Sequence, residues 1–146
     1  MDRKNAQILQ ILSEDARISN LALAERIGLS PSACLRRVQE LERSGVITGY
    51  RAQLDRGRLG LGFLAYITVG LNLHTKTAQK AFERAMHKAG EVTECHNIAG
   101  AFEYLLRVEV ADIAAYKRFH SETLGSLPQV NSITTYVVLD SPKTVA

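Results

Sequence analysis

The sequence contains no tryptophan, only two cysteines and only three prolines among its 146 residues. Cys34 and Cys95 lie far apart and form neither a Cys-x-x-Cys pair nor a Cys/His cluster, which argues against a zinc site and against a disulfide framework. The four histidines form no ligand pair at helical spacing, so no bound metal is expected. Both thiols are therefore predicted to be small buried side chains.

Long apolar runs are also missing. The longest run, residues 62–73, is interrupted by Tyr66, Thr68 and Asn72 and falls short of the ~20 residues that cross a bilayer. Residues 1–5 lead into an amphipathic pattern and not into the apolar core of a secretory signal. We therefore expect a cytoplasmic protein without a membrane partner.

Charge is distributed unevenly along the chain. The formal net charge is +3, and residues 1–60 hold ten Lys and Arg against seven Asp and Glu, whereas residues 61–146 hold eight of each. The whole positive excess therefore lies in the first 60 residues. An excess of this size does not by itself identify a polyanionic partner, so the positions of the individual cations have to decide.

The first part of the chain has the pattern of short helices. Apolar residues recur at helical spacing over residues 6–12 and predict a first helix. A second helix is expected to begin after Ser19 or Asn20 as the N-cap and to end at Gly28, which suits the left-handed backbone of a helix C-terminus.

A third helix follows almost at once. Ser30 is a suitable N-cap, and Pro31 suits the first helical position, where a missing N–H costs nothing. This helix is predicted to run to about Arg43 and to stop at Gly45. Two helices joined by a short turn that contains glycine have the spacing of a helix-turn-helix.

The pattern then changes. Residues 46–52 are β-branched and interrupted by glycine, which predicts a short strand or wing. Residues 55–62 contain three glycines and little apolar surface, and are the best candidate for a linker. The predicted organisation is a winged helix-turn-helix domain over residues 1–54, the linker over 55–62 and a second domain over 63–146.

In residues 63–146, segments with the two-residue period of a strand alternate with segments that have the spacing of a helix. The predicted order is a strand over 63–73, a helix over 75–89, strands over 92–98 and 104–110, a helix between Asp112 and Pro128, and a strand over 130–139. This is the ferredoxin-like βαββαβ arrangement, so the fold class is α+β. Its open sheet face would carry Tyr66, Tyr136 and Val138, which predicts a dimer through that face.

The third helix carries the candidate DNA contacts. Leu35, Val38 and Leu41 are expected to face inward, so the surface is formed by Ser32, Ala33, Arg36, Arg37 and Glu40. The two arginines would bind phosphate or guanine, Ser30 and Ser32 would bind phosphate, and Arg51 of the wing completes the set. An arginine pair on an amphipathic helix can also serve only to solvate it. The two preceding helices, the Ser-Pro restart and the wing favour double-stranded DNA as the partner.

The segments GLSPSACLRRV (residues 28–38) and LERSGVITGY (residues 41–50) resemble the winged helix-turn-helix of the Lrp/AsnC, or feast/famine, regulators. Residues 100–106 and 134–139 resemble the effector domain of that family. The resemblance covers nearly the whole chain. It implies a bacterial or archaeal transcription regulator associated with the nucleoid, dimers that assemble into octamers or related discs, and an amino acid effector bound between dimers.

Carried over position by position, the effector site that the resemblance implies consists of Gly100, Glu103, Tyr104, Thr134, Thr135, Tyr136 and Val138. Backbone N–H groups near Gly100 can receive a carboxylate and the acidic side chain can receive an ammonium group. The family usually has Asp where this chain has Glu103, whose extra methylene changes the room for a ligand. The alternative is a plain β-turn with Tyr104 packed in the core.

Two other classes of function compete with a ligand-responsive regulator. An architectural protein would wrap DNA through backbone charge and DNA deformability, without an effector. An enzyme would need a set of nucleophile, base and orienting residues, a P-loop or a GxGxxG motif, and none occurs in the sequence. We therefore expect no enzymatic activity and no cofactor.

Overall fold

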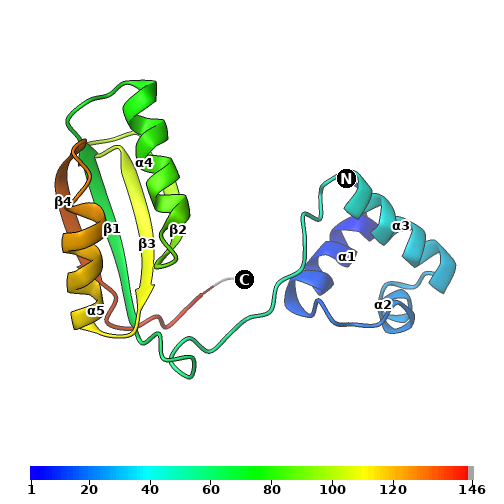
Figure 1. Cartoon of the computed structure of the whole chain (residues 1–146). Helices are drawn as coiled ribbons and strands as arrows, with labels where there is room; N and C mark the ends of the chain where they lie inside the picture. The colour runs from blue at the N-terminus through cyan, green and yellow to red at the C-terminus, as the bar shows by residue number, and fades with distance from the viewer. Residues whose placement is uncertain (145–146) are drawn as a thin grey trace. The chain divides into compact units, whose positions relative to one another are not determined.

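The structure is a computed structural model that describes residues 1–144. It contains two compact units, one built from residues 1–54 and one from residues 55–143 (Figure 1). None of the helices in the described residues has the length and apolar character that a membrane crossing requires. Each unit has its own hydrophobic core and is described by itself.

The N-terminal unit consists of three helices: α1 (Arg3–Glu14), α2 (Asn20–Ile27) and α3 (Pro31–Arg43). Ser19 and Ser30 are the N-caps of α2 and α3, and each side chain accepts a hydrogen bond from the backbone N–H three residues later, at 3.1 and 3.2 Å. Gly28 ends α2 with φ of +70°, a backbone conformation that residues other than glycine rarely adopt. The predicted helix-turn-helix is confirmed.

The inward face of α3 differs from the prediction. Cys34 is completely buried and Leu41 nearly so, whereas Leu35 is 45% exposed. At 100° per residue, positions 34, 38 and 41 span an arc of about 60°, whereas positions 35, 38 and 41 span about 120°. The narrower stripe packs better against neighbouring helices, so Cys34 takes the place that was expected for Leu35.

Residues 46–52 were predicted to form a short strand or wing; the strand is wrong, because this segment is irregular. No strand lies in the described part of the N-terminal unit to pair with it, and an isolated strand leaves its backbone groups without partners. Ile47 nevertheless ties the segment to the helices: its N–H donates to the Leu41 carbonyl at 3.0 Å, and its side chain packs on the core.

Residues 55–62, the predicted linker, form a set of turns. The Leu59 N–H donates to the carbonyls of Asp55 and Arg56 at 3.3 and 3.1 Å. The Arg56 guanidinium lies 3.4 Å from the carboxylate of Glu109. These contacts join the segment to the C-terminal unit.

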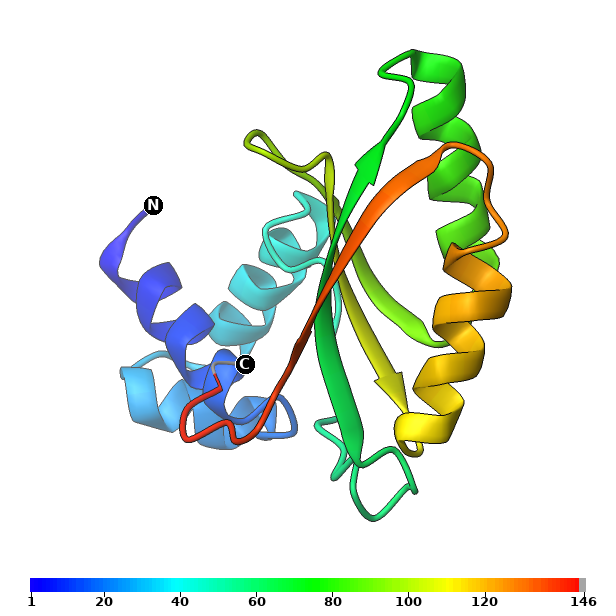
Figure 2. The same cartoon turned by 90° about the vertical axis from the view of Figure 1, so that its left-hand side faces the viewer.

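The C-terminal unit is a four-stranded antiparallel sheet with two helices on one side (Figure 2). In chain order the elements are β1 (Phe63–Leu71), α4 (Lys76–Lys88), β2 (Val92–Asn97), β3 (Tyr104–Val110), α5 (Ile113–Arg118) with a π-helical continuation (Phe119–Leu124), and β4 (Val130–Val137). The strand order is β2-β3-β1-β4. The predicted βαββαβ arrangement and the α+β class are confirmed.

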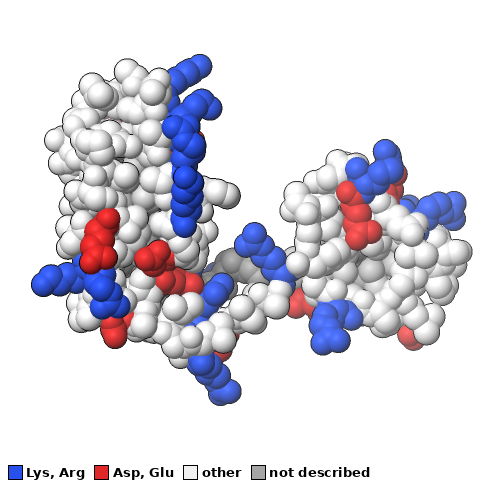
Figure 3. Space-filling view, in the orientation of Figure 1, with Lys and Arg blue, Asp and Glu red and all other residues white. Residues whose placement is uncertain are grey.

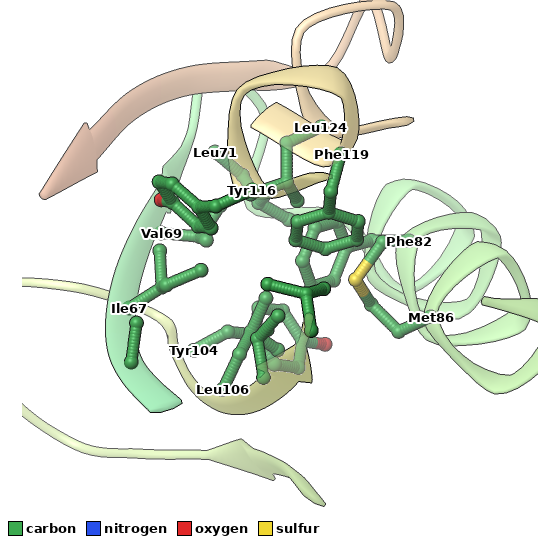
Figure 4. Close-up of a cluster of buried hydrophobic side chains, with 13 residues drawn as sticks. Ile67, Val69, Leu71, Phe82, Met86, Tyr104, Leu106, Tyr116, Phe119 and Leu124 are labelled. Atoms are coloured by element: carbon green, nitrogen blue, oxygen red, sulfur yellow. The ribbon is translucent and has the colours of Figure 1, made fainter. Parts of the chain in front are cut away.

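The core of this unit lies between the sheet and the helices. Alternate residues of the two central strands, including Ile67, Val69 and Leu106, meet Phe82 of α4 and Phe119 of the π-helical segment (Figure 4). All five are at most 1% exposed. The last strand ends two residues earlier than predicted, so Leu139 lies beyond it and is 96% exposed instead of taking a place on a sheet face.

Candidate functional site

The N-terminal end of α3 brings two serines together. The Ser30 hydroxyl accepts a hydrogen bond from the Ala33 N–H at 3.2 Å and lies 3.4 Å from the Ser32 hydroxyl. Ser32 is exposed and Ala33 is half-buried. Because the Ser30 oxygen already accepts from the Ala33 N–H, the Ser32 hydroxyl, which contacts Ser30, is the better placed of the two to bind an anion near the positive end of the helix dipole.

The two arginines of α3 have different surroundings. Arg36 is exposed and forms no ion pair with any described residue. Arg37 is half-buried, and its Nη1 donates to Asp2 Oδ2 at 2.7 Å and to Asn5 Oδ1 at 3.1 Å. The Asn5 N–H, followed by the Arg37 guanidinium, lowers the pKa of the Asp2 carboxyl. Arg37 therefore braces α3 against the start of α1.

Glu40 is also engaged on the surface of α3. Its two carboxylate oxygens accept from Arg43 at 2.5 and 2.9 Å, and this contact lowers the pKa of Glu40. The sequence reasoning did not include Arg43, although a spacing of three residues on one helix favours such a pair. The pair neutralises Glu40, so Arg36 and the exposed Arg51 of the following loop supply the remaining positive charge among the predicted residues.

The predicted effector residues Gly100 and Glu103 lie in and after the turn between β2 and β3. Gly100 has φ of +152°, within the region that favours glycine. Glu103 is firmly held: Oε2 accepts from the Leu71 N–H at 3.0 Å, and Oε1 lies 2.6 Å from Nδ1 of His74. Its side chain is only 19% exposed. The sequence reasoning missed His74, because no local pattern relates a loop after β1 to the start of β3.

Tyr104 lies on the opposite side of the strand, in the core. It is 1% exposed, its ring centroid is 4.7 Å from that of Phe82, and its hydroxyl donates to the Glu83 carboxylate of α4. Burial, and then the contact with Glu83, raise the pKa of the Tyr104 hydroxyl well above its usual range. This is the packing that the alternative interpretation of residues 100–104 anticipated.

The residues predicted on β4 divide between the two faces of the sheet. Thr134 and Tyr136 lie opposite Thr68 and Tyr66 on the open face. Thr135 lies opposite buried Ile67 on the helix face, where its hydroxyl bonds that of Tyr116. The remaining residue, Val138, follows the strand end and donates its N–H to the Leu64 carbonyl at 2.9 Å. Within one chain, the structure does not bring the seven predicted effector residues into one pocket.

The open face also carries an ion network that the sequence reasoning did not include. Glu109 is only 5% exposed, and its Oε1 lies 2.6 Å from Nη1 of Arg107. Arg107 also reaches Thr93 at 3.0 Å and Glu94 at 3.5 Å. Tyr66, which lies opposite Arg107, is 37% exposed, and its neighbour Tyr136 is 55% exposed. The exposed aromatic side chains of the open face therefore lie on β1 and β4.

A groove of about 430 Å³ lies between α4 and β2, lined in part by Glu83, His87, Cys95 and Asn97. Cys95 is exposed, contrary to the prediction of a buried thiol, because β2 is an edge strand with one side unpaired. Partial burial first, and the nearby Glu83 carboxylate second, raise the pKa of this thiol to about 11. The thiol is therefore protonated at neutral pH and a weak nucleophile.

A helix-turn-helix unit followed by a small α+β unit, with exposed cations on the second helix of the motif, defines a DNA-binding regulator. Comparison with protein families agrees unit by unit: residues 1–48 match the winged helix-turn-helix DNA-binding family, and residues 64–145 match the Lrp/AsnC ligand binding domain. The chain belongs to the Lrp/AsnC family of transcriptional regulators, which are not enzymes.

Individual relatives support the same assignment. The chain is 43% identical over 143 residues to the leucine-responsive regulatory proteins of Escherichia coli and Salmonella typhimurium, which covers 98% of this chain and 87% of theirs. Among solved structures, a Neisseria meningitidis transcriptional regulator in complex with L-Met has a TM-score of 0.95 at 35% identity, covering 99% of this chain and 94% of that one. An AsnC family regulator from Agrobacterium tumefaciens has a TM-score of 0.93 at 31% identity, with the same coverage.

Proposed function

We propose that α3 reads specific DNA sequence in the major groove, with Arg36 as its principal base or phosphate contact. Thirteen residues make α3 about 20 Å long, which suits the groove. The observation that carries this proposal is the exposure of Arg36 without an ion-pair partner among the described residues. Ser30, Ser32, Ala33, Glu40 and Arg51 would flank it, while Arg37 would hold α3 at its angle to α1.

For the C-terminal unit we propose an amino acid effector. The Glu103 carboxylate would receive the ligand's ammonium group, and backbone N–H groups around Gly100 would receive its carboxylate. A relative of 35% identity was solved with L-Met, which supports an amino acid as the ligand class. Thr134, Tyr136 and Val138 would enter from a neighbouring protomer or line the approach, because the effector would lie between dimers.

The active form would be a homodimer that assembles further, to an octamer or a related disc, and that acts in the cytoplasm on the nucleoid. Tyr66 and Tyr136 support a dimer, because two adjacent exposed tyrosines form an apolar patch on the open sheet face. An effector between dimers would change their stacking and therefore the spacing between successive α3 helices on the duplex. A single chain mass by light scattering at micromolar concentration would contradict this assembly.

Selection from a random-sequence duplex library, followed by affinity measurements on the enriched duplex, tests the DNA proposal. We expect one enriched sequence, and Arg36→Gln should weaken its binding by about 5- to 150-fold, which corresponds to 1–3 kcal/mol for a specific base contact. Lys117→Gln removes another exposed positive charge, from α5, and should change little. Binding without any enriched sequence would favour the architectural function instead.

A thermal-shift screen against the twenty amino acids tests the effector proposal. A ligand present at 100 times its Kd adds about 2.7 kcal/mol to the native state, which is a measurable shift. Glu103→Gln keeps an acceptor for the Leu71 N–H but removes the negative charge, so it should abolish the shift. Glu122→Gln, an exposed carboxylate of the π-helical segment, is the matched control. An undiminished shift in Glu103→Gln would exclude Glu103 as the ammonium partner.

A further inference from the structure

Four cations form a row along α4. Lys76, Lys80, Arg84 and Lys88 recur at every fourth residue, and all four are exposed. The space-filling view shows a continuous column of basic side chains over α4 (Figure 3). We call these four residues the basic row. The DNA-binding surface of α3 lies in the other unit and does not include them.

The basic row is not neutralised by its surroundings. None of its members forms an ion pair with any described residue. Glu83 is the one acidic residue of α4, and its carboxylate accepts a hydrogen bond from the hydroxyl of Tyr104 in β3. Residues 55–143 hold ten Lys and Arg and nine Asp and Glu, so four of the ten cations but one of the nine anions lie on this helix. The unit is nearly neutral overall, yet this helix is strongly positive.

The row is unfavourable for α4 on its own. Like charges four residues apart on one helix repel each other, and each such pair destabilises the helix. An anionic partner that lies along the helix would relieve this repulsion. Each step of four residues advances about 6 Å, so the row extends over about 18 Å. Duplex DNA presents one negative charge for every ~1.7 Å of its axis, so its backbone can match a row of this length.

The helix is poorly suited to an anionic membrane surface. A helix that binds in a membrane interface exposes a large apolar face beside its cations. The large apolar residues of α4, Phe82 and Met86, are instead buried at 0 and 1% exposure in the core. Duplex DNA is the partner with which members of this family already interact, and lysine and arginine bind phosphate without needing an apolar face.

We propose that the basic row of α4 is a second DNA contact, which binds the phosphate backbone of duplex outside the segment read by α3. This contact is independent of sequence. It makes the effector-binding unit part of the DNA-binding surface, so the affinity for long DNA exceeds the affinity for the recognition site alone. The inference rests on DNA binding by α3 but not on the identity of the effector.

The test compares two duplexes, a recognition site of about 20 base pairs and the same site centred in about 100 base pairs. The first variant changes all four members of the basic row to Gln. The control variant changes four other exposed cations of the same unit to Gln, and these are Arg58, Lys117, Arg118 and Lys143. Both variants lose the same net charge. Affinities are measured over a series of salt concentrations.

For the long duplex, we expect the plot of log affinity against log salt to become shallower by about 2–4 in the row variant, because each lost phosphate contact removes ~0.9 from the slope. The control variant should keep the wild-type slope, and all three proteins should bind the short duplex within twofold. A double variant, Lys76→Gln with Lys80→Gln, should lose about half as much slope. It keeps the proposal testable if the fourfold variant fails to fold. Equal slopes in the row and control variants would overturn the proposal. If the wild-type protein bound neither duplex, the proposal that α3 binds DNA would instead be refuted.

Discussion

Replacement of Tyr104 by Phe tests whether this residue stabilises the core or binds the effector. The substitution removes one oxygen atom and keeps the ring, which packs against Phe82 with centroids 4.7 Å apart. The hydroxyl that is lost donates to the Glu83 carboxylate, on the helix face of the sheet. Because this face is away from Thr134 and Tyr136, Tyr104→Phe should lower stability and leave effector affinity unchanged.

The size of the effect follows from the environment of the two partners. A hydrogen bond to a charged group contributes about 1.5–3 kcal/mol. The Glu83 residue is exposed, so water solvates its carboxylate once the hydroxyl is gone, and this compensation reduces the loss. Tyr104 itself is 1% exposed, and phenylalanine suits that apolar setting. We therefore expect a loss of about 1–2 kcal/mol in the free energy of unfolding.

Urea unfolding followed by far-ultraviolet circular dichroism measures this loss, at one fixed protein concentration because assembly contributes to stability. Tyrosine fluorescence is a second probe, since the chain has five tyrosines and no tryptophan. Isothermal titration of both proteins with the effector supplies the other half of the test. A tenfold weaker effector affinity with unchanged stability would refute the placement of Tyr104 in the core.

The same pair of proteins predicts a pH dependence. Burial first and the Glu83 carboxylate second raise the pKa of Tyr104 in the folded protein, whereas an unfolded tyrosine titrates near its ordinary value of about 10. Above pH 10 the unfolded chain therefore binds fewer protons than the folded one, and stability falls as pH rises, by up to ~1.4 kcal/mol per pH unit. The advantage of Tyr104 over Phe should be constant below pH 10 and shrink above it.

Three further substitutions, the first with a matched control, test the backbone and the packing of the two units. Gly28→Ala should lower the free energy of unfolding by about 1 kcal/mol, because φ is +70° there, while Gly49→Ala, which has open space around the added Cβ, should stay within about 0.5 kcal/mol; equal losses would contradict the conformational explanation. Cys34→Ser should cost about 1–3 kcal/mol by urea unfolding, because it buries a hydroxyl where the thiol is 0% exposed, and an unchanged midpoint would place residue 34 at the surface. Thr135→Val removes the hydroxyl partner of Tyr116, so it should cost about 1–2 kcal/mol and leave effector titrations unchanged.

Local chemistry was sufficient to locate most helix and strand ends. Ser19 and Ser30 have side chains that satisfy free N–H groups, and Gly28 has the backbone freedom that a helix end needs, so these signals act within four residues. The period of two in residues 63–73 similarly predicted β1, which the structure has at Phe63–Leu71. Such features are predictable because the interactions that produce them are short in sequence.

Interactions between distant segments were not predictable in this way. The inward face of α3 depends on which stripe fits the neighbouring helices, and both Cys34 and Leu35 are apolar enough to be candidates. The contact of His74 with Glu103 joins residues 29 positions apart, and that of Arg56 with Glu109 joins residues 53 apart. A single sequence contains no signal for such pairs, because the topology of the sheet determines which distant residues come into contact.

The geometry of Glu103 restricts how an effector can be bound. One carboxylate oxygen accepts from the Leu71 N–H and the other contacts His74, so an incoming ammonium group has to share or replace the histidine contact. The side chain of His74 is 71% exposed, so its displacement into water removes little packing. The Leu71 contact, by contrast, belongs to the end of β1 and fixes the carboxylate in place. An ammonium group would therefore approach from the side of His74, and substitutions of this histidine should change effector affinity even though it lies outside the set of residues that the resemblance implies.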